Sequence, residues 1–337
     1  MAKGDRILIL IMSCRAEFFQ NEVKRICSTW GSRLPKDTYI GYYDGAWEQS
    51  GVNIEDGGVI HVKSTSPDDL EHTFLKTWDA LSQLYQRNDT RFDWIFRVNT
   101  STWVNVPLLR KFVDEIATKD NLYASDIYSL TEAAAPQPLD LYARGNAFLM
   151  SDKIVNVLLV EGINLMYLNV VDDVAMGNVI NSYFIKQSHS FDAYLDHIKG
   201  LPHGWYKCVN KHIDTGHALC DYCGSETQDF YNRLMTVQTK MYRNREQEHK
   251  NMEDFYNMMK DVPEPSLDCA VEYMKNPSIF IGSILGYISL ADWKKVGKAK
   301  LYAYEMSHKA IDDKQNKNYS QEEYEKLHQV PGMEKPK

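Results

Sequence analysis

The stretch FDWIFRVNTSTWVN, residues 92–105, decides the fold class. Apolar side chains recur through its first half with the alternation of a strand. Three small polar residues follow, Asn99, Thr100 and Ser101, and the chain then resumes with an aromatic residue, a valine and an asparagine. Ligands of parallel sheets lie beyond the carboxyl ends of the strands, so these polar residues are candidates for a binding site.

The segments around this stretch alternate between strand and helix patterns. Ile7–Ser13 is a continuous apolar run of the kind found in a sheet that is covered on both faces. The sequence predicts further strands at residues 38–45, 59–63 and 91–98, and helices at residues 17–30, 68–86 and 106–118. This alternation predicts an α/β fold with a mostly parallel central sheet and flanking helices.

The second half of the chain has a different pattern. Short strands are expected at residues 121–128 and 141–151, followed by a helix at residues 151–160. From about residue 225 onward the sequence is charged and helical, with one long amphipathic helix expected at 226–260 and another at 289–312. We therefore divide the chain into a sheet domain at 1–224, a helical C-terminal extension at 225–312 and a polar, flexible tail at 313–337.

The composition argues against two kinds of partner. Hydrophobic residues make up 44% of the 337 positions and charged residues 25%, and the net charge is −8, so nucleic acid is not an expected partner. The apolar run Ile7–Met12 is too short for a signal peptide or a transmembrane segment, and no later run reaches spanning length. The sequence therefore predicts a cytoplasmic protein with no transmembrane segment.

Four segments carry a resemblance to a known family. They are ILILIMSC with VKRICSTWG, then DDLEHTFLKTW with FDWIFRVNTSTWVNVPLL, then LYARGNAFLMS, and last VVDDVAMG. In this order they resemble the motifs of the fringe-like glycosyltransferases of family 31, the β-1,3-galactosyl- and N-acetylglucosaminyltransferases. The resemblance spans Ile7 to about Asn181 and implies a GT-A fold, which is a Rossmann-like α/β architecture.

The chain departs from that family at its metal site. Family members carry a DxD-type cluster of acids where this chain has Asn99, Thr100 and Ser101. Neutral oxygens are poor ligands for Mg²⁺ or Mn²⁺, so no divalent metal cofactor is expected. Basic side chains are expected to neutralise the donor diphosphate in its place. With the resemblance, the expected donor-binding residues are Arg25, Asp44, Lys76, Arg97, Asn99, Thr100, Ser101, Lys207 and Lys211.

The expected catalytic base lies in VVDDVAMG. An inverting transfer needs a carboxylate that removes the proton of the acceptor hydroxyl, and the resemblance gives this role to Asp173, with Asp172 as the alternative. Both acids also suit the first turn of a helix. The expected acceptor-binding residues are Arg144, Gly145, Asn146, Trp103 and Trp205, although core packing explains the two tryptophans equally well.

These features predict an inverting, metal-independent enzyme that moves a sugar from a nucleotide sugar, by resemblance a UDP-sugar, to a glycan hydroxyl. A lipid-linked and a protein-linked glycan are both candidate acceptors. The different-class alternative is a catalytically inactive relative that binds a glycan or a partner protein. The pair Asp172–Asp173 favours the enzyme, because a binding module has no chemical need for a carboxylate there.

A cluster of cysteines and histidines near the middle of the chain remains open between three interpretations. The residues are Cys208, His212, His217, Cys220 and Cys223. Thiolate and imidazole suit tetrahedral zinc, but the spacing fits no standard zinc motif closely. A disulfide and ordinary thiols are the other two interpretations.

Overall fold

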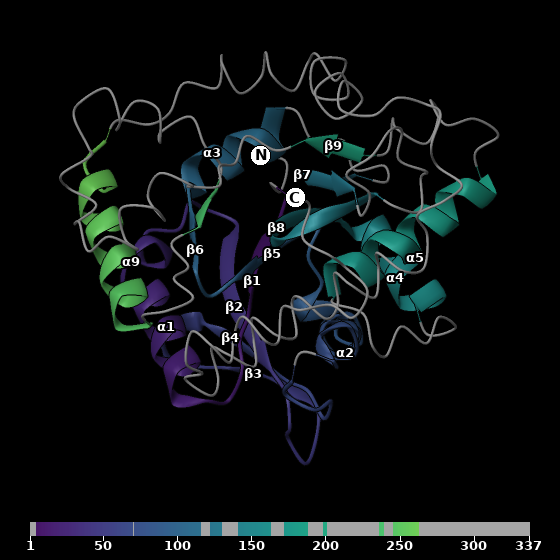
Figure 1. Cartoon of the computed structure of the whole chain (residues 1–337), viewed down its shortest axis with the longest axis horizontal. Coiled ribbons are helices and arrows are strands. Elements are labelled where there is room, and N and C mark those ends of the chain that lie inside the picture. Colours follow the sequence, from purple (N-terminus) through teal and green to yellow (C-terminus); the bar gives the residue numbers. More distant parts are fainter. Residues whose placement is uncertain are drawn as a thin grey trace, which may run out of the picture.

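The fold is a central sheet between two layers of helices (Figure 1). The computed structural model describes residues 5–69, 71–115, 122–129, 141–162, 172–187, 198–200, 236–238 and 245–262. Within them, one sheet has eight strands. In sheet order these are β3 (Gly51–Ile54), β4 (Ile60–Lys63), β2 (Thr38–Asp44), β1 (Ile7–Met12), β5 (Trp94–Asn99), β8 (Leu141–Ser151), β7 (Tyr123–Ser129) and β9 (Ile198–Gly200).

The centre of the sheet is parallel. β1 pairs in parallel with both β2 and β5, and β2 pairs in parallel with β4. The apolar side chains of Ile7 to Ile11 are fully buried, because helices cover both faces of this strand. The remaining strands make the sheet mixed, since β3, β8 and β7 join through antiparallel pairs and β9 joins β7 in parallel. The expected α/β class with a mostly parallel sheet is confirmed.

Among the described residues, three helices cover each face of the sheet. One face carries α1 (Glu17–Ser28), α3 (Val106–Glu115) and α9 (Arg245–Met259). The other carries α2 (Thr73–Tyr85), α4 (Asp152–Glu161) and α5 (Asp172–Gln187). Figure 1 shows the two layers on opposite sides of the strands. Short 3₁₀ turns occur at Trp30–Ser32, Asp56–Gly58 and Asn88–Thr90.

Strand β3 was not expected from the sequence. Residues 51–54 have weak strand character, and they pair with β4 through a tight connection that contains Gly57 and Gly58. Both glycines have positive φ values, 79° and 80°, which side chains with a Cβ rarely adopt. The turn, rather than the strand residues, therefore determines this hairpin.

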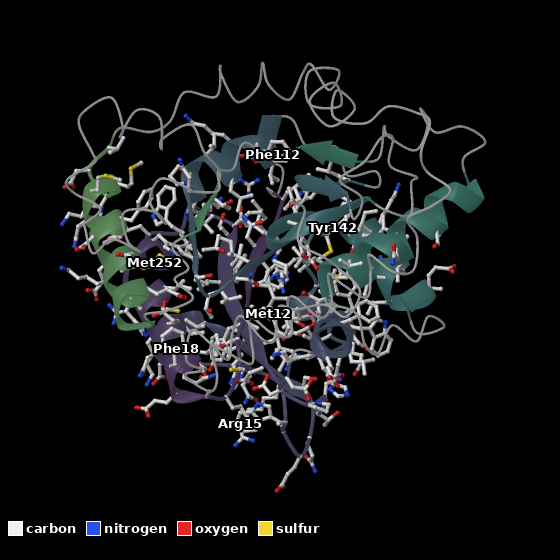
Figure 2. All side chains as sticks on the ribbon, in the orientation of Figure 1. Met12, Arg15, Phe18, Phe112, Tyr142 and Met252 are labelled. Carbon is white, nitrogen blue, oxygen red and sulfur yellow. The ribbon has the colours of Figure 1, made fainter. Side chains whose placement is uncertain are left out.

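The described residues after position 224 belong to the same core as the sheet. β10 (Thr236–Gln238) pairs antiparallel with β6 (Thr102–Val104), and α9 packs against α1. Met252 and Phe255 of α9 are fully buried in the core on the α1 face. Figure 2 shows Met252 and Phe18 on the same side of the sheet. The prediction of one long helix over 226–260 is wrong, because 236–238 form a strand.

Parts of the sequence prediction lie outside the described residues. They are the helix at 289–312 and the tail at 313–337. Among the residues that the structure does describe, no helix combines the length and the apolar character needed to cross a membrane.

Candidate active site

The carboxyl ends of β2, β1 and β5 form one edge of the sheet. Met12 pairs with Tyr43 on one side and with Asn99 on the other. Neighbouring strands lie about 4.8 Å apart, so the ends of β2 and β5 are about 10 Å from each other. Asp44 and Asn99 are therefore within the span of one small-molecule site, as the sequence predicts.

Arg97 of β5 is the centre of a buried polar network at this edge. Its side chain is 0% exposed. Nε donates to the hydroxyl of Tyr43 at 3.3 Å, and Nη1 donates to Asn99 Oδ1 at 2.9 Å. The guanidinium also donates to the Gly145 carbonyl oxygen and to the Asp172 carboxylate, and it contacts the sulfur of Met12. Each guanidinium nitrogen therefore has a partner within the protein.

This enclosure changes the role expected of Arg97. Burial by itself lowers the pKa of Arg97, but Asp172 and Tyr43 outweigh it, and the pKa lies above its ordinary value. The guanidinium is charged and its charge is matched by Asp172. The sequence predicts that Arg97 contacts the donor diphosphate. The geometry instead gives it a positioning role, because a side chain with no exposed surface cannot meet an incoming phosphate.

Asp172 and Asp173 are the first two residues of α5, and the structure separates their environments. Asp172 pairs with Arg97. Asp173 accepts hydrogen bonds from the backbone N–H of Gly145 and of Val174, both at 2.8 Å. Burial, and then the neighbouring charge of Asp172, raise the pKa of Asp173 to about 7, although Arg97 and the two N–H groups act in the opposite direction. Asp173 thus titrates near neutral pH.

Gly145 allows the close approach of β8 to α5. A Cβ built on Gly145 would lie 2.8 Å from Asp173 Oδ2 and 3.2 Å from its Cγ, closer than real Cβ atoms come to a carboxylate oxygen. The next residue, Asn146, is buried, and its carbonyl oxygen accepts a hydrogen bond from Thr102 Oγ1 at 3.0 Å. Of Arg144, the structure describes the backbone within β8 and not the side chain.

The loop that follows β5 does not suit a divalent metal. Asn99 Oδ1 already accepts a hydrogen bond from Arg97, and a guanidinium beside that oxygen repels a cation. Thr100 and Ser101 are each only 4% exposed and offer neutral oxygens. Among the described residues, no group of three or more His, Cys, Asp or Glu side chains is arranged to hold a metal. The residues present do not fit the metal site of the family that the sequence resembles.

Asp44 lies at the end of β2 and is 1% exposed. Its carboxylate accepts hydrogen bonds from Gln20 at 2.9 Å, Trp47 at 2.5 Å and His61 at 2.9 Å. Burial by itself raises the pKa of Asp44, but the bonds from His61 and Trp47 outweigh it, and the pKa is lowered. The sequence predicts that the carboxylate oxygens of Asp44 bind the nucleotide, but three side chains of the protein already donate to them. Asp44 therefore holds Gln20, Trp47 and His61 in position at this edge of the sheet.

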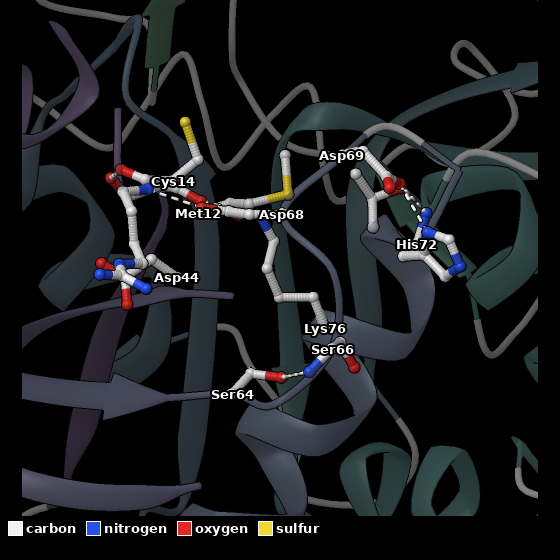
Figure 3. Close-up of polar contacts among 12 residues, drawn as sticks. Met12, Cys14, Asp44, Ser64, Ser66, Asp68, Asp69, His72 and Lys76 are labelled. Carbon is white, nitrogen blue, oxygen red and sulfur yellow. Dashed lines mark hydrogen bonds and ion pairs between the residues drawn. The ribbon is translucent and has the colours of Figure 1, made fainter. Parts of the chain in front are cut away.

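Lys76 of α2 also has internal partners (Figure 3). Its ammonium is 2.6 Å from Asp68 Oδ1 and donates to the Ser13 carbonyl oxygen at 2.8 Å. Its side chain is 4% exposed, so a direct contact with the donor sugar needs a rearrangement. The sequence predicts that α2 begins near Asp68. It begins at Thr73 instead.

Two further expected site residues, Arg25 and Trp103, contact α9 on the face of the sheet that this helix covers. Arg25 forms an ion pair with Glu253 of α9 and lies 3.8 Å from Glu22. Trp103 is 5% exposed, and its ring packs edge-on against Phe255 with 4.9 Å between the centroids. Arg25 therefore joins α1 to α9, and its contact with the donor stays a prediction. The core-packing interpretation of Trp103 is the one that the geometry favours.

The remaining expected residues lie outside the described residues. They are Lys207, Lys211, Trp205 and the cluster Cys208, His212, His217, Cys220 and Cys223. Conversely, sequence reasoning missed Tyr43, His61 and Trp47, which shape the same edge. The signal of Tyr43 and Trp47 is their position at or just beyond the carboxyl end of β2, whereas His61 lies near the start of β4 and has no such signal.

No protein-family model matches the chain, and no curated protein matches it by sequence. Among solved structures, the apo form of the bifunctional glycosyltransferase WbbM is similar with a TM-score of 0.41 and 12% identity, over 78% of this chain and 51% of that one. The chain thus spans about half the length of WbbM. A glycosyltransferase involved in the glycosylation of the major capsid of PBCV-1 is similar with a TM-score of 0.36 and 11% identity, over 74% of this chain and 99% of that one. Likeness at this level gives this chain neither a family nor an activity.

Proposed function

We propose that the protein is an inverting, metal-independent glycosyltransferase of the GT-A type. It moves a hexosyl or N-acetylhexosaminyl group from a nucleotide sugar, a UDP-sugar by the resemblance of its motifs, to the hydroxyl of an acceptor glycan. The donor and the acceptor meet at the carboxyl edge of β1, β2 and β5, in front of Asp173.

One observation carries this proposal: the four segments that resemble the family's motifs meet at the Arg97 side chain. Met12 belongs to the first segment, Asn99 to the second with Arg97 itself, Gly145 to the third and Asp172 to the fourth. These residues are separated by up to 160 positions, and nothing in a structural core requires a buried arginine at their junction. Burying such charges lowers the stability of the fold unless each charge is paired. The presence of this network at a sheet edge therefore favours a functional site.

Asp173 is the catalytic base of the proposed reaction. It takes the proton of the acceptor hydroxyl while the oxygen attacks the anomeric carbon, and the nucleoside diphosphate leaves with the bonding electrons from the opposite side of the sugar. A pKa of about 7 suits a base that works near neutral pH. The N–H groups of Gly145 and Val174 hold the carboxylate in one orientation. Arg97 keeps the neighbouring Asp172 in place, and so acts through the two acids.

The test is turnover of a panel of nucleotide sugars with glycan acceptors, measured as release of the nucleoside diphosphate. Asp173→Asn keeps the shape but cannot accept the proton, and we expect it to lower the rate by about 10²–10⁴ while leaving nucleotide binding nearly unchanged. Asp114→Asn, at an exposed ion pair with Arg110 on α3, is the matched control. Near wild-type turnover of Asp173→Asn would refute the assignment of the base. Binding of a nucleotide sugar without turnover in any condition would replace the enzyme with a binding module.

A further inference from the structure

The proposed reaction requires positive charge beside the donor diphosphate, and Arg25, Lys76 and Arg97, the basic residues expected there whose side chains the structure describes, are already paired with acids. Arg97 is enclosed and paired with Asp172, and Lys76 is enclosed and paired with Asp68. Arg25 pairs with Glu253 against α9. Within the described residues, the charge must come from another part of the same edge.

Two other cations lie at that edge, one on each side of Trp47 in the sheet order. Arg15 follows the end of β1, and Lys63 ends β4. The guanidinium carbon of Arg15 is 4.6 Å from the centroid of the Trp47 ring, and the ammonium of Lys63 is 4.2 Å from it. The two charged groups therefore lie within about 9 Å of each other.

Trp47 holds this arrangement in place. Its indole N–H donates to Asp44 Oδ1 at 2.5 Å, and its backbone N–H donates to the carbonyl oxygen of Ser64 at 3.0 Å. The ring face attracts the cations through its quadrupole and takes no proton or charge from them. The ring consequently holds two positive groups within about 9 Å of each other, which electrostatic repulsion alone would not favour.

Neither cation forms an ion pair with a carboxylate among the described residues. Arg15 donates from its side chain to the carbonyl oxygen of Ala46 at 2.7 Å, and this leaves most of its five N–H donors open. The two nearby acids are already engaged: Asp44 by its three donors and Asp68 by Lys76. Arg15 is exposed and Lys63 is half-buried, so both are accessible from solvent. Figure 2 shows Arg15 at the periphery of the molecule.

We infer that Arg15 and Lys63 form the diphosphate-binding site of the donor nucleotide. This inference deepens the proposed function and rests on it for the identity of the nucleotide. A diphosphate carries charge on two phosphates, and two cations within about 9 Å match that distribution better than one. Arg15 binds phosphate through its planar fork of donors and Lys63 as a compact point charge.

Calorimetric titration with UDP, uridine and inorganic pyrophosphate tests the inference without any turnover. We expect Arg15→Gln and Lys63→Gln each to weaken binding of UDP and of pyrophosphate by about tenfold, the loss of one charge-assisted contact. Binding of uridine should not change. Arg15→Lys and Lys63→Arg keep the charge and should retain most of the affinity. The matched control, Arg87→Gln, removes the same charge at an exposed pair with Asp89 and should change nothing.

The outcomes separate this inference from the proposed function. Pyrophosphate binding that depends on Arg15 and Lys63, in a protein that binds no nucleotide, would support the anion site and refute the glycosyltransferase. UDP binding that is unchanged in Arg15→Gln and Lys63→Gln would overturn the anion site and leave the proposed function standing. Binding of neither UDP nor pyrophosphate by the wild-type protein would also overturn the site.

Discussion

The strongest structural prediction concerns the replacement Arg97→Met. Methionine has a similar length and fills much of the same space, but it leaves the Asp172 carboxylate without its partner in a buried setting. The Asp172 side chain is 8% exposed and that of Arg97 is 0% exposed. Removing one member of a buried ion pair typically costs about 3–5 kcal/mol, against a total stability of about 5–15 kcal/mol. We therefore expect Arg97→Met to lower the free energy of unfolding by about 3–5 kcal/mol.

Equilibrium unfolding in urea measures this loss, and two further variants show its cause. Arg91→Met breaks an Arg–Asp pair of the same type, with Asp152, but the two side chains are 50% and 32% exposed. Such a pair contributes about 0–1 kcal/mol, so this control should be nearly neutral. In Arg97→Met with Asp172→Asn, the stranded charge is absent, and part of the stability should return. Equal losses of unfolding free energy in Arg97→Met and Arg91→Met would refute the account of the network. So would a double variant that loses more unfolding free energy than the two single variants together.

Three other predictions follow from the same edge of the sheet. Because the pKa of Asp173 is raised from 3.8 to about 7, the folded state binds the proton more tightly than the unfolded state. The free energy of unfolding should therefore fall as the pH rises from about 4 to about 7, by up to about 1.4 kcal/mol per pH unit. Urea titrations of Asp173→Asn at several pH values should lack this slope. Gly145→Ala forces a Cβ to 2.8 Å from Asp173 Oδ2, so it should cost about 1–3 kcal/mol in urea unfolding and about 10² in turnover, whereas Gly51→Ala, which meets no atom within 4 Å, should be silent. Turnover should persist in excess EDTA, and complete loss that Mn²⁺ restores would show that a metal binds through other ligands.

Local patterns in the sequence were enough to predict the main elements of the sheet. The apolar run of β1, the alternation of β5 and the helix spacing of α1 and α4 each occupy the predicted positions. The convergence of the strand ends also followed, because parallel strands that are joined by helices end at the same edge. These features depend on residues that are close in the sequence.

The use of individual side chains at that edge could not be predicted in the same way. The sequence indicates that Arg97 and Lys76 are near the site but not that Asp172 and Asp68 already pair with them. That information is in contacts between distant segments. The helix prediction over 226–260 failed for a related reason, since residues 236–238 become a strand by pairing with β6. Tertiary pairing outweighed their local preference.

The position of α9 has a consequence for how the chain is made in the cell. Arg25 of α1 contacts the backbone of His249, 224 residues later, and Phe255 completes the core beside Trp103. A ribosome releases the N-terminal segments long before it reaches that helix, so the apolar side of α1 and β6 stays open to water during most of synthesis. Contacts of such large sequence separation also close slowly. We therefore expect any association of nascent chains to occur through that side, before residues 245–259 cover it.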